Sequence, residues 1–335
     1  PTTPPPLPLS PTFVRPPPPH LPRGSPPRPP PPPPPQPGVR YVAFGDSMTV
    51  APHGGGGGVL GLPTYQQQPK TVPAPNPLAC ARSNFGWPSI MAAQWGLGAA
   101  QTGDWADYAC QSATTDTEPV NNLRTQIDQS VHDGMLGPAT RLVTIQISAN
   151  DVWHPGQVSN YAYTLAMCLT DIVRGCDYRT DPDHYIDADA ITGPNLAHRL
   201  TAGIRGDMIG AIRAAAPHAQ IRLVGYEDQN PPPGVPFTCF SVFGLRFQWP
   251  QYRTAYAHKL TDNIENAMSA AADQIGIGFW SLRPVGIGRD LCAPATHWTG
   301  LADPGEPFFP FHPNLQAHFD QGSYLNGIRL AEGIA

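Results

Sequence analysis

The sequence predicts an α/β fold built on a parallel sheet. Short runs rich in β-branched and aromatic residues alternate along the chain with longer segments in which apolar residues recur every three or four positions. Strands that alternate with helices are joined by right-handed crossovers and therefore form a parallel sheet. About 300 residues follow a proline-rich beginning, which is enough for one large core.

Five segments have the composition of strands. Residues 141–148 (RLVTIQIS) are the clearest, because β-branched residues alternate in them, and residues 39–44 (VRYVAF) form a shorter β-rich run. The weaker candidates are 105–109, 221–226 and 277–282. We expect these segments to form the sheet.

Four segments have the periodicity of helices. Residues 87–97 carry an apolar pattern with Pro88 in the first turn, where proline is well tolerated. Apolar residues recur every four positions over 196–212 and predict one long amphipathic helix. Segments 252–268 and 313–330 predict two more helices.

Three polar residues fall where such a sheet places its functional site, beyond the carboxyl ends of the strands. Ser47 follows the first strand, Asn150 follows the third, and His312 stands just before the last helix. A serine needs a base within hydrogen-bond reach to act as a nucleophile, and the oxyanion that forms needs a donor aimed at it. Together these residues predict a nucleophile, an oxyanion donor and a general base at one rim.

The order of the surrounding motifs resembles that of the SGNH/GDSL hydrolases over roughly residues 39–335. The matching segments are GDS at 45–47, YACQSATT at 108–115, SAND at 148–151 and HPN at 312–314. The resemblance implies a flavodoxin-like three-layer α/β/α sandwich with a five-stranded parallel sheet. It also implies a secreted esterase or lipase.

The resemblance assigns a role to each motif. Ser47 is the nucleophile and His312 the base, and the oxyanion hole is formed by the Ser47 N–H, the Ser112 N–H and the side-chain amide of Asn150. The family has glycine where this chain has Ser112 and Ser148. Because a serine keeps its backbone N–H, the role of Ser112 survives the change.

One motif position departs from the family pattern more seriously. The family places an acid three residues before the histidine, and here that residue is Phe309. An orienting group must accept the Nδ1–H bond of His312 and fix its tautomer, and a backbone carbonyl meets that need without a charge. Our hypothesis is that the Phe309 carbonyl orients His312. Asp303 and Glu306 are the rival carboxylates.

Residues 1–38 differ from the rest of the chain. They hold 21 of the 45 prolines and no Asp or Glu, a composition that cannot pack a core and favours extended polyproline II. We expect a disordered tail or linker there and one hydrolase domain over 39–335. The tail carries +3, so that the net charge of −5 leaves −8 on the remainder, which disfavours a nucleic-acid partner. The sequence has no apolar run of 18 residues, so no transmembrane segment is expected.

The six cysteines indicate an oxidising compartment. Their number is even and their spacing matches no zinc motif, which favours disulfides and a secreted or extracellular protein, although six buried thiols in a cytosolic enzyme remain an alternative. Six thiols allow 15 pairings, and spacing alone does not choose among them. The family resemblance implies the pairs Cys80–Cys110, Cys168–Cys176 and Cys239–Cys292.

Neither a metal nor an organic cofactor is expected. The glycines at 56, 58 and 61 match a dinucleotide fingerprint only by letters, because no helix opens after them. The acidic stretch 177–189 fits no calcium loop. The histidines other than His312 lack metal spacing, and we interpret most of them as surface or structural residues.

The sequence therefore predicts a serine hydrolase that cleaves small-molecule or lipid carboxylic esters. We expect a monomer that its proline-rich tail tethers to a wall, a surface or an upstream domain. One alternative is a carbohydrate or cell-wall O-acetylesterase on the same site. Another is a non-catalytic surface protein with a decayed site. Several aromatic side chains near the predicted rim would form either an acyl-binding surface or a satellite core, namely Trp153, Phe237, Phe240, Phe243, Phe247 and Trp249.

Overall fold

The structure is a computed structural model. It describes residues 37–51, 64–66, 80–100, 102–116, 122–151, 191–242, 244–250, 254–300 and 311–335, which lie within the compact unit Pro35–Ala335. Some sequence predictions fall on other residues. The tail up to residue 36, the Cys168–Cys176 pair, the acidic stretch 177–189 and the orienting group Phe309, with its rivals Asp303 and Glu306, lie outside the described residues.

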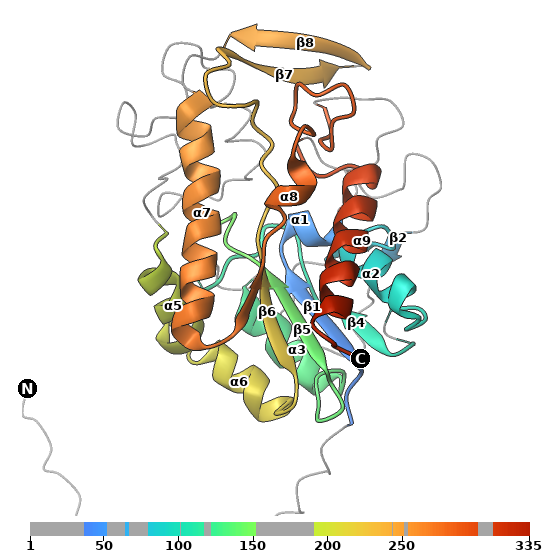
Figure 1. The fold of residues 1–335 in the computed structure, drawn as a ribbon. Coiled ribbons are helices and arrows are strands. Elements are labelled where there is room, and N and C mark those ends of the chain that lie inside the picture. Colours follow the sequence, from blue (N-terminus) through green and yellow to red (C-terminus); the bar gives the residue numbers. More distant parts are fainter. Residues whose placement is uncertain are drawn as a thin grey trace, which may run out of the picture. The chain divides into compact units, whose positions relative to one another are not determined.

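Five parallel strands form the central sheet, in the order β4-β1-β5-β6-β9 (Figure 1). Their bounds are Tyr41–Gly45 for β1, Trp105–Asp107 for β4, Leu142–Gln146 for β5, Gln220–Val224 for β6 and Gly278–Trp280 for β9. Every residue of β1 and β5 is buried, as in parallel strands that are covered on both faces. The predicted five-stranded parallel sheet is confirmed.

Helices cover both faces of the sheet and make three layers. One face carries α3 (Leu123–His132), α5 (Gly193–Ala202), α6 (Met208–Ala215) and α7 (Thr254–Ile275), and the other carries α2 (Trp87–Trp95) and α9 (Leu315–Ala331) (Figure 1). Alternate residues of β1 divide between the two cores, because successive side chains of a strand point to opposite faces. Val42 and Phe44 pack into the first core, and Tyr41 and Ala43 into the second.

The prediction of one long helix over 196–212 is wrong. The chain forms α5 and α6 instead, separated by a turn in which Gly206 has a φ of +78°. Asp207 then starts α6 by accepting a hydrogen bond from the Gly210 N–H at 2.6 Å. The four-residue apolar repeat runs through the turn by coincidence, and its central member Ile204 has an exposed fraction of 78%.

Several shorter elements lie outside the central sheet. They are α1 (Ser47–Val50), α8 (Arg283–Gly286), the strand pair β2 (Thr64–Gln66) and β3 (Ala81–Ser83), and the hairpin β7 (Phe237–Val242) and β8 (Leu245–Pro250). The hairpin occupies part of a region expected to be a rim loop. Its Phe240 ring packs on the rings of Phe247 and Trp249, with centroids 6.0 Å apart in both pairs.

Two disulfides tie these peripheral segments to the fold. Cys80 is bonded to Cys110, and Cys239 of β7 is bonded to Cys292. They are two of the three pairs that the family resemblance implies. None of the helices in the described part of the chain combines the length and hydropathy that crossing a membrane requires.

Candidate active site

Ser47 is the first residue of α1, immediately beyond the carboxyl end of β1. Asp46 caps this helix, because its carboxylate accepts a hydrogen bond from the Met48 N–H at 2.9 Å. The turn requires glycine at position 45, where a Cβ would lie only 2.2 Å from Thr49 Oγ1. The exposed fraction of Ser47 is 7%, so its hydroxyl stands in a largely desolvated position at the edge of the sheet.

His312 reaches Ser47 from the segment before α9. Its Nε2 atom lies 2.8 Å from Ser47 Oγ. Hydrogen bonds to a neighbouring segment hold the backbone of His312: its N–H donates to Thr299 Oγ1 at 3.0 Å, and its carbonyl accepts from the Thr299 N–H at 2.9 Å. The Asn314 N–H donates to the His297 carbonyl at 2.8 Å. His312 is therefore fixed on both sides by short antiparallel pairing.

Asn150 and Ser112 come from the turns after β5 and β4. The Asn150 Nδ2 group donates to the Ala113 carbonyl at 2.9 Å, which joins the two turns. The Nδ2 group of Asn150 has two N–H donors. One donates to Ala113, and the other is not needed for that hydrogen bond. The Cys80–Cys110 disulfide lies just before Ser112 in the chain. The two oxyanion donors predicted from the sequence thus belong to turns that are bound to each other.

Asp151 strengthens the same connection. Its buried carboxylate accepts hydrogen bonds from the N–H of Thr115 at 3.0 Å and from the Thr115 hydroxyl at 2.9 Å, and Arg199 Nη1 of α5 lies 3.2 Å away. Burial raises the pKa of Asp151 to about 6, although Arg199 and Thr115 act in the opposite direction. The residue that follows Asn150 is thus a charged anchor between α5 and the turn after β4.

Comparison with known proteins gives this arrangement a family. The sequence profile of the GDSL-like lipase/acylhydrolase family matches residues 43–318, which include all of the site residues above. The chain belongs to this family. Lipase 2 of Streptomyces coelicolor is 28% identical over 286 residues, which are 83% of this chain and 81% of that protein. The crystal structure of an extracellular lipase from Streptomyces rimosus shares the fold, with a TM-score of 0.52 and 20% identity over 89% of this chain and all of that one.

Membership of the GDSL-like family makes the chain a carboxylic ester hydrolase of the serine type. The three-layer fold with its five-stranded parallel sheet agrees with this assignment.

The two positions at which this GDSL-like chain replaces the family's glycine keep a glycine-like backbone. Ser112 has a φ of +58° and Ser148 a φ of +120°, in a region that residues with a Cβ rarely adopt. Ser148 is fully buried, and its Oγ atom has no hydrogen-bond partner in the described part of the chain. The fold thus retains the turn, and a side chain that does not suit this backbone conformation lowers the free energy of unfolding.

Replacement of Ser148 by glycine is expected to stabilise the protein by about 1 kcal/mol, because it removes a strained backbone conformation and a buried, unbonded hydroxyl. Urea unfolding measures the change as a higher midpoint. Ser130→Gly is the matched control, since Ser130 is equally buried but lies in α3 and donates to the Ile127 carbonyl. The control is expected to lower the midpoint, and a lower midpoint for Ser148→Gly as well would contradict the interpretation of strain.

A buried cluster supports the segment that holds His312. The side chain of His297 lies between two carboxylates, with Nδ1 2.8 Å from Glu227 Oε2 and Nε2 3.1 Å from Asp320 Oδ2. Gln321 of α9 donates to the other oxygen of Glu227 at 2.8 Å. His297 therefore connects the end of β6 to α9. We predicted that most of the other histidines are surface or structural residues, and His297 is a structural one.

His318 lies in the same region, fully buried in α9. Its Nδ1 atom accepts a hydrogen bond from the Trp87 N–H at 3.2 Å. Burial, with the nearby His312 and His297 acting in the same direction, lowers the pKa of His318 to about 3. A neutral imidazole is therefore maintained behind the candidate base at ordinary pH.

Several residues of the site region were not identified from the sequence, among them Tyr226, Glu227 and Asp320. Tyr226 and Glu227 follow β6, and a position at the carboxyl end of a parallel strand is the signal that could have marked them.

As for metals, the described segments contain no group of three or more His, Cys, Asp or Glu side chains that could hold an ion.

Proposed function

We propose that this ester hydrolase acts through Ser47 as nucleophile and His312 as general base. The observation that carries the proposal is the 2.8 Å distance between Ser47 Oγ and His312 Nε2. As Oγ attacks the acyl carbon of the ester, its proton passes to Nε2. The tetrahedral intermediate then collapses, and the alcohol leaves with that proton. Water attacks the acyl-enzyme with the help of the same histidine and releases the acid.

In this proposal the oxyanion is held by three donors: the backbone N–H groups of Ser47 and Ser112 and the Nδ2 group of Asn150. The bond from Asn150 to the Ala113 carbonyl supports this role, because it orients the amide and holds it next to the turn of Ser112. Donors that are fixed before the reaction stabilise the developing charge without reorganisation.

The orienting group of His312 remains a hypothesis. We propose the carbonyl of Phe309, because a carbonyl can accept the Nδ1–H bond and because the position holds no carboxylate. Asp303 and Glu306 are the alternatives within the same stretch. The two hydrogen bonds between the backbone of His312 and Thr299 fix the main chain of the base and leave its tautomer to the orienting group.

We propose a secreted, monomeric enzyme whose hydrolase domain spans 39–335 and whose residues 1–38 form a tether. Two disulfides in the described residues and the extracellular lipase of S. rimosus support secretion. The substrate is a small-molecule or lipid ester, with lipid the preferred class because the curated relative is called a lipase. An O-acetylesterase on the same site is the second candidate.

A serine-directed organophosphate is expected to label Ser47 stoichiometrically, and mass spectrometry of the digested protein locates the adduct. The urea-unfolded protein serves as the control and should stay unlabelled, because Ser47 then lacks its base. A series of p-nitrophenyl esters of increasing acyl length follows. Turnover of long acyl chains supports a lipase, turnover of acetate alone supports the O-acetylesterase, and no labelling in the folded protein would point to a non-catalytic protein.

A further inference from the structure

The side chain of Tyr226 joins the two halves of the candidate site. Its hydroxyl donates a hydrogen bond to Asp46 Oδ2 at 2.6 Å. The oxygen of the Tyr226 hydroxyl also accepts a hydrogen bond from the Ala149 N–H at 3.2 Å. Asp46 precedes Ser47, and Ala149 precedes Asn150. One buried hydroxyl group thus connects the turn of the nucleophile to the turn of the oxyanion donor.

Both connections lead directly to backbone that positions the reacting groups. Asp46 is the N-cap of α1, and its other oxygen accepts from the Met48 N–H at 2.9 Å, so its carboxylate sets the orientation of the helix that begins with Ser47. Ala149 lies in the turn in which Ser148 has a positive φ. A change at the hydroxyl would therefore move the two turns relative to each other.

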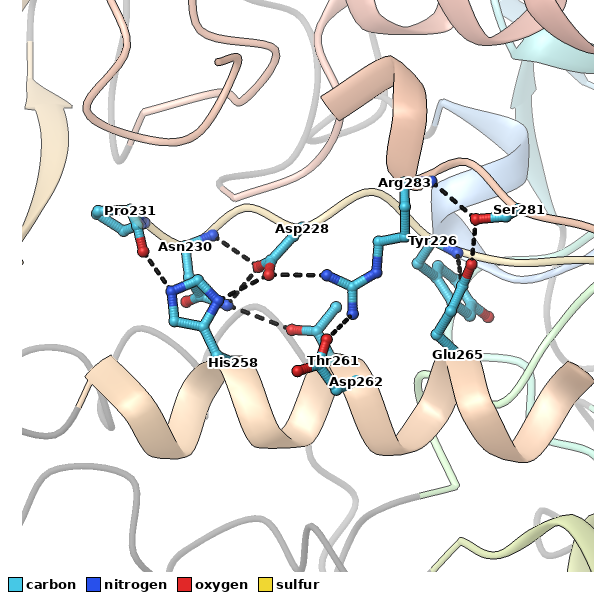
Figure 2. A network of polar contacts seen from close by, with 10 residues as sticks. All are labelled: Tyr226, Asp228, Asn230, Pro231, His258, Thr261, Asp262, Glu265, Ser281 and Arg283. Atoms are coloured by element: carbon cyan, nitrogen blue, oxygen red, sulfur yellow. Dashed lines mark hydrogen bonds and ion pairs between the residues drawn. The ribbon is translucent and has the colours of Figure 1, made fainter. Parts of the chain in front are cut away.

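A second set of contacts holds the backbone of Tyr226 and the residues after it (Figure 2). The Tyr226 N–H donates to Glu265 Oε2 of α7 at 3.2 Å, and Glu265 in turn accepts a hydrogen bond from the Ser281 hydroxyl. Arg283 reaches Asp228, two residues further along the chain, at 2.8 Å. The segment that follows β6 is thus bound to α7 and α8 and offers a rigid base for the tyrosine ring.

We infer that Tyr226 is a positioning residue for ester hydrolysis, and that its hydroxyl acts through Asp46 to hold Ser47 in register with Asn150. The inference rests on the proposed function of Ser47 and Asn150. A displacement of catalytic groups by about 1 Å can slow a reaction by about 10²-fold. The Tyr226 hydroxyl contacts Asp46 and Ala149, and it acts on the reacting groups through them.

The electrostatics of Asp46 provide an independent readout. Burial raises the pKa of Asp46 to about 7, and the hydrogen bond from Tyr226 acts in the opposite direction. The other ionisable group that acts on it is Asp151 after β5, which raises its pKa. His312 contacts Ser47, the next residue in the chain. Loss of the Tyr226 hydroxyl removes a donor to the ionised carboxylate and raises the pKa of Asp46 further. A protonated Asp46 is a weaker acceptor for the Met48 N–H at the start of α1. The acid limb of the kcat profile is therefore expected to move to higher pH.

The test compares Tyr226→Phe with Tyr41→Phe. Tyr41 is another buried tyrosine, in β1, and its hydroxyl bonds to Thr144 Oγ1 at 2.9 Å. Both variants lose one buried hydroxyl, and Tyr226→Phe is expected to lose more stability because its hydroxyl makes two hydrogen bonds, one of them to a carboxylate. Tyr226→Phe is expected to lower kcat about tenfold with KM within about twofold. Its acid limb should shift upward by about half a pH unit. Tyr41→Phe is expected to leave kcat and the pH profile as in the wild type.

The outcomes separate this inference from the proposed function. A kcat for Tyr226→Phe equal to that of Tyr41→Phe overturns the inference, and so does a lower kcat without the shift of the acid limb, because the hydroxyl then does not act through Asp46. Thermal melts verify that both variants are folded at the assay temperature. If Ser47→Ala retains turnover, the proposed function fails. If Ser47→Ala is inactive while Tyr226→Phe behaves like its control, only the role of Tyr226 fails.

Discussion

Replacement of Ser47 by alanine is expected to lower kcat for a short p-nitrophenyl ester by about 10⁴- to 10⁶-fold, as in other serine hydrolases that lose their nucleophile. The physical reason is that the hydroxyl hydrogen-bonded to His312 Nε2, at 2.8 Å, is that of Ser47. Alanine fits the position of Ser47 without a clash, so the thermal midpoint should stay close to that of the wild type. Steady-state kinetics with the purified variant measure the loss.

Two further variants sharpen this result. His312→Ala is expected to show a comparable loss, and the double variant should be hardly slower than either single one, because a nucleophile and its base act as one unit. Ser323→Ala is the control, since Ser323 lies on α9 and accepts a hydrogen bond from Gln94 in an exposed contact. Turnover by Ser47→Ala at the wild-type rate would contradict the mechanism and require another nucleophile.

The sheet and the motif positions could be predicted because both depend on local patterns. Residues 141–148 contain β5, and their apolar, β-branched composition suits a strand buried on both faces. Once the strands are known, the carboxyl edge of a parallel sheet is where chemistry-bearing residues gather. Ser47 and His312 are 265 residues apart in sequence, and only this topological rule brings them to one place before the structure is known.

The helix α3 could not be predicted, because half of its buried face is polar. Its buried residues include Gln126 and Ser130, which break the apolar periodicity. Gln126 is buried because its side-chain amide bonds to both backbone groups of Gly45, accepting from the N–H at 3.0 Å and donating to the carbonyl at 2.8 Å. A polar side chain that serves a distant turn leaves no local signal in the sequence.

The cluster around His297 could not be predicted from the sequence for a related reason. Glu227, His297 and Asp320 lie at positions far apart in the chain, and each alone has the appearance of an ordinary surface residue. Burial of such groups is favourable only when all of them are paired at once. That condition depends on the packing of α9 against the end of β6, which is tertiary information.

Replacement of Asn150 by alanine is expected to lower kcat by about 10²- to 10³-fold, the effect of removing one oxyanion donor. KM should change little, because the donor interacts more strongly with the transition state than with the ground-state ester. The variant also leaves the Ala113 carbonyl without the donor at 2.9 Å, so a loss of about 1–3 kcal/mol in the free energy of unfolding is expected as well. Urea unfolding and steady-state kinetics measure the two effects separately.

Asn150→Asp completes this experiment. Aspartate has the size of asparagine, but when ionised it only accepts hydrogen bonds, so it places a negative charge where the oxyanion develops. The loss in kcat should therefore equal or exceed that of Asn150→Ala. An increase in KM at constant kcat in either variant would mean that Asn150 binds the ester in its ground state. A rate close to the wild type in Asn150→Ala would mean that the backbone N–H groups of Ser47 and Ser112 suffice, and the Asn150–Ala113 contact would then serve only to join the two turns.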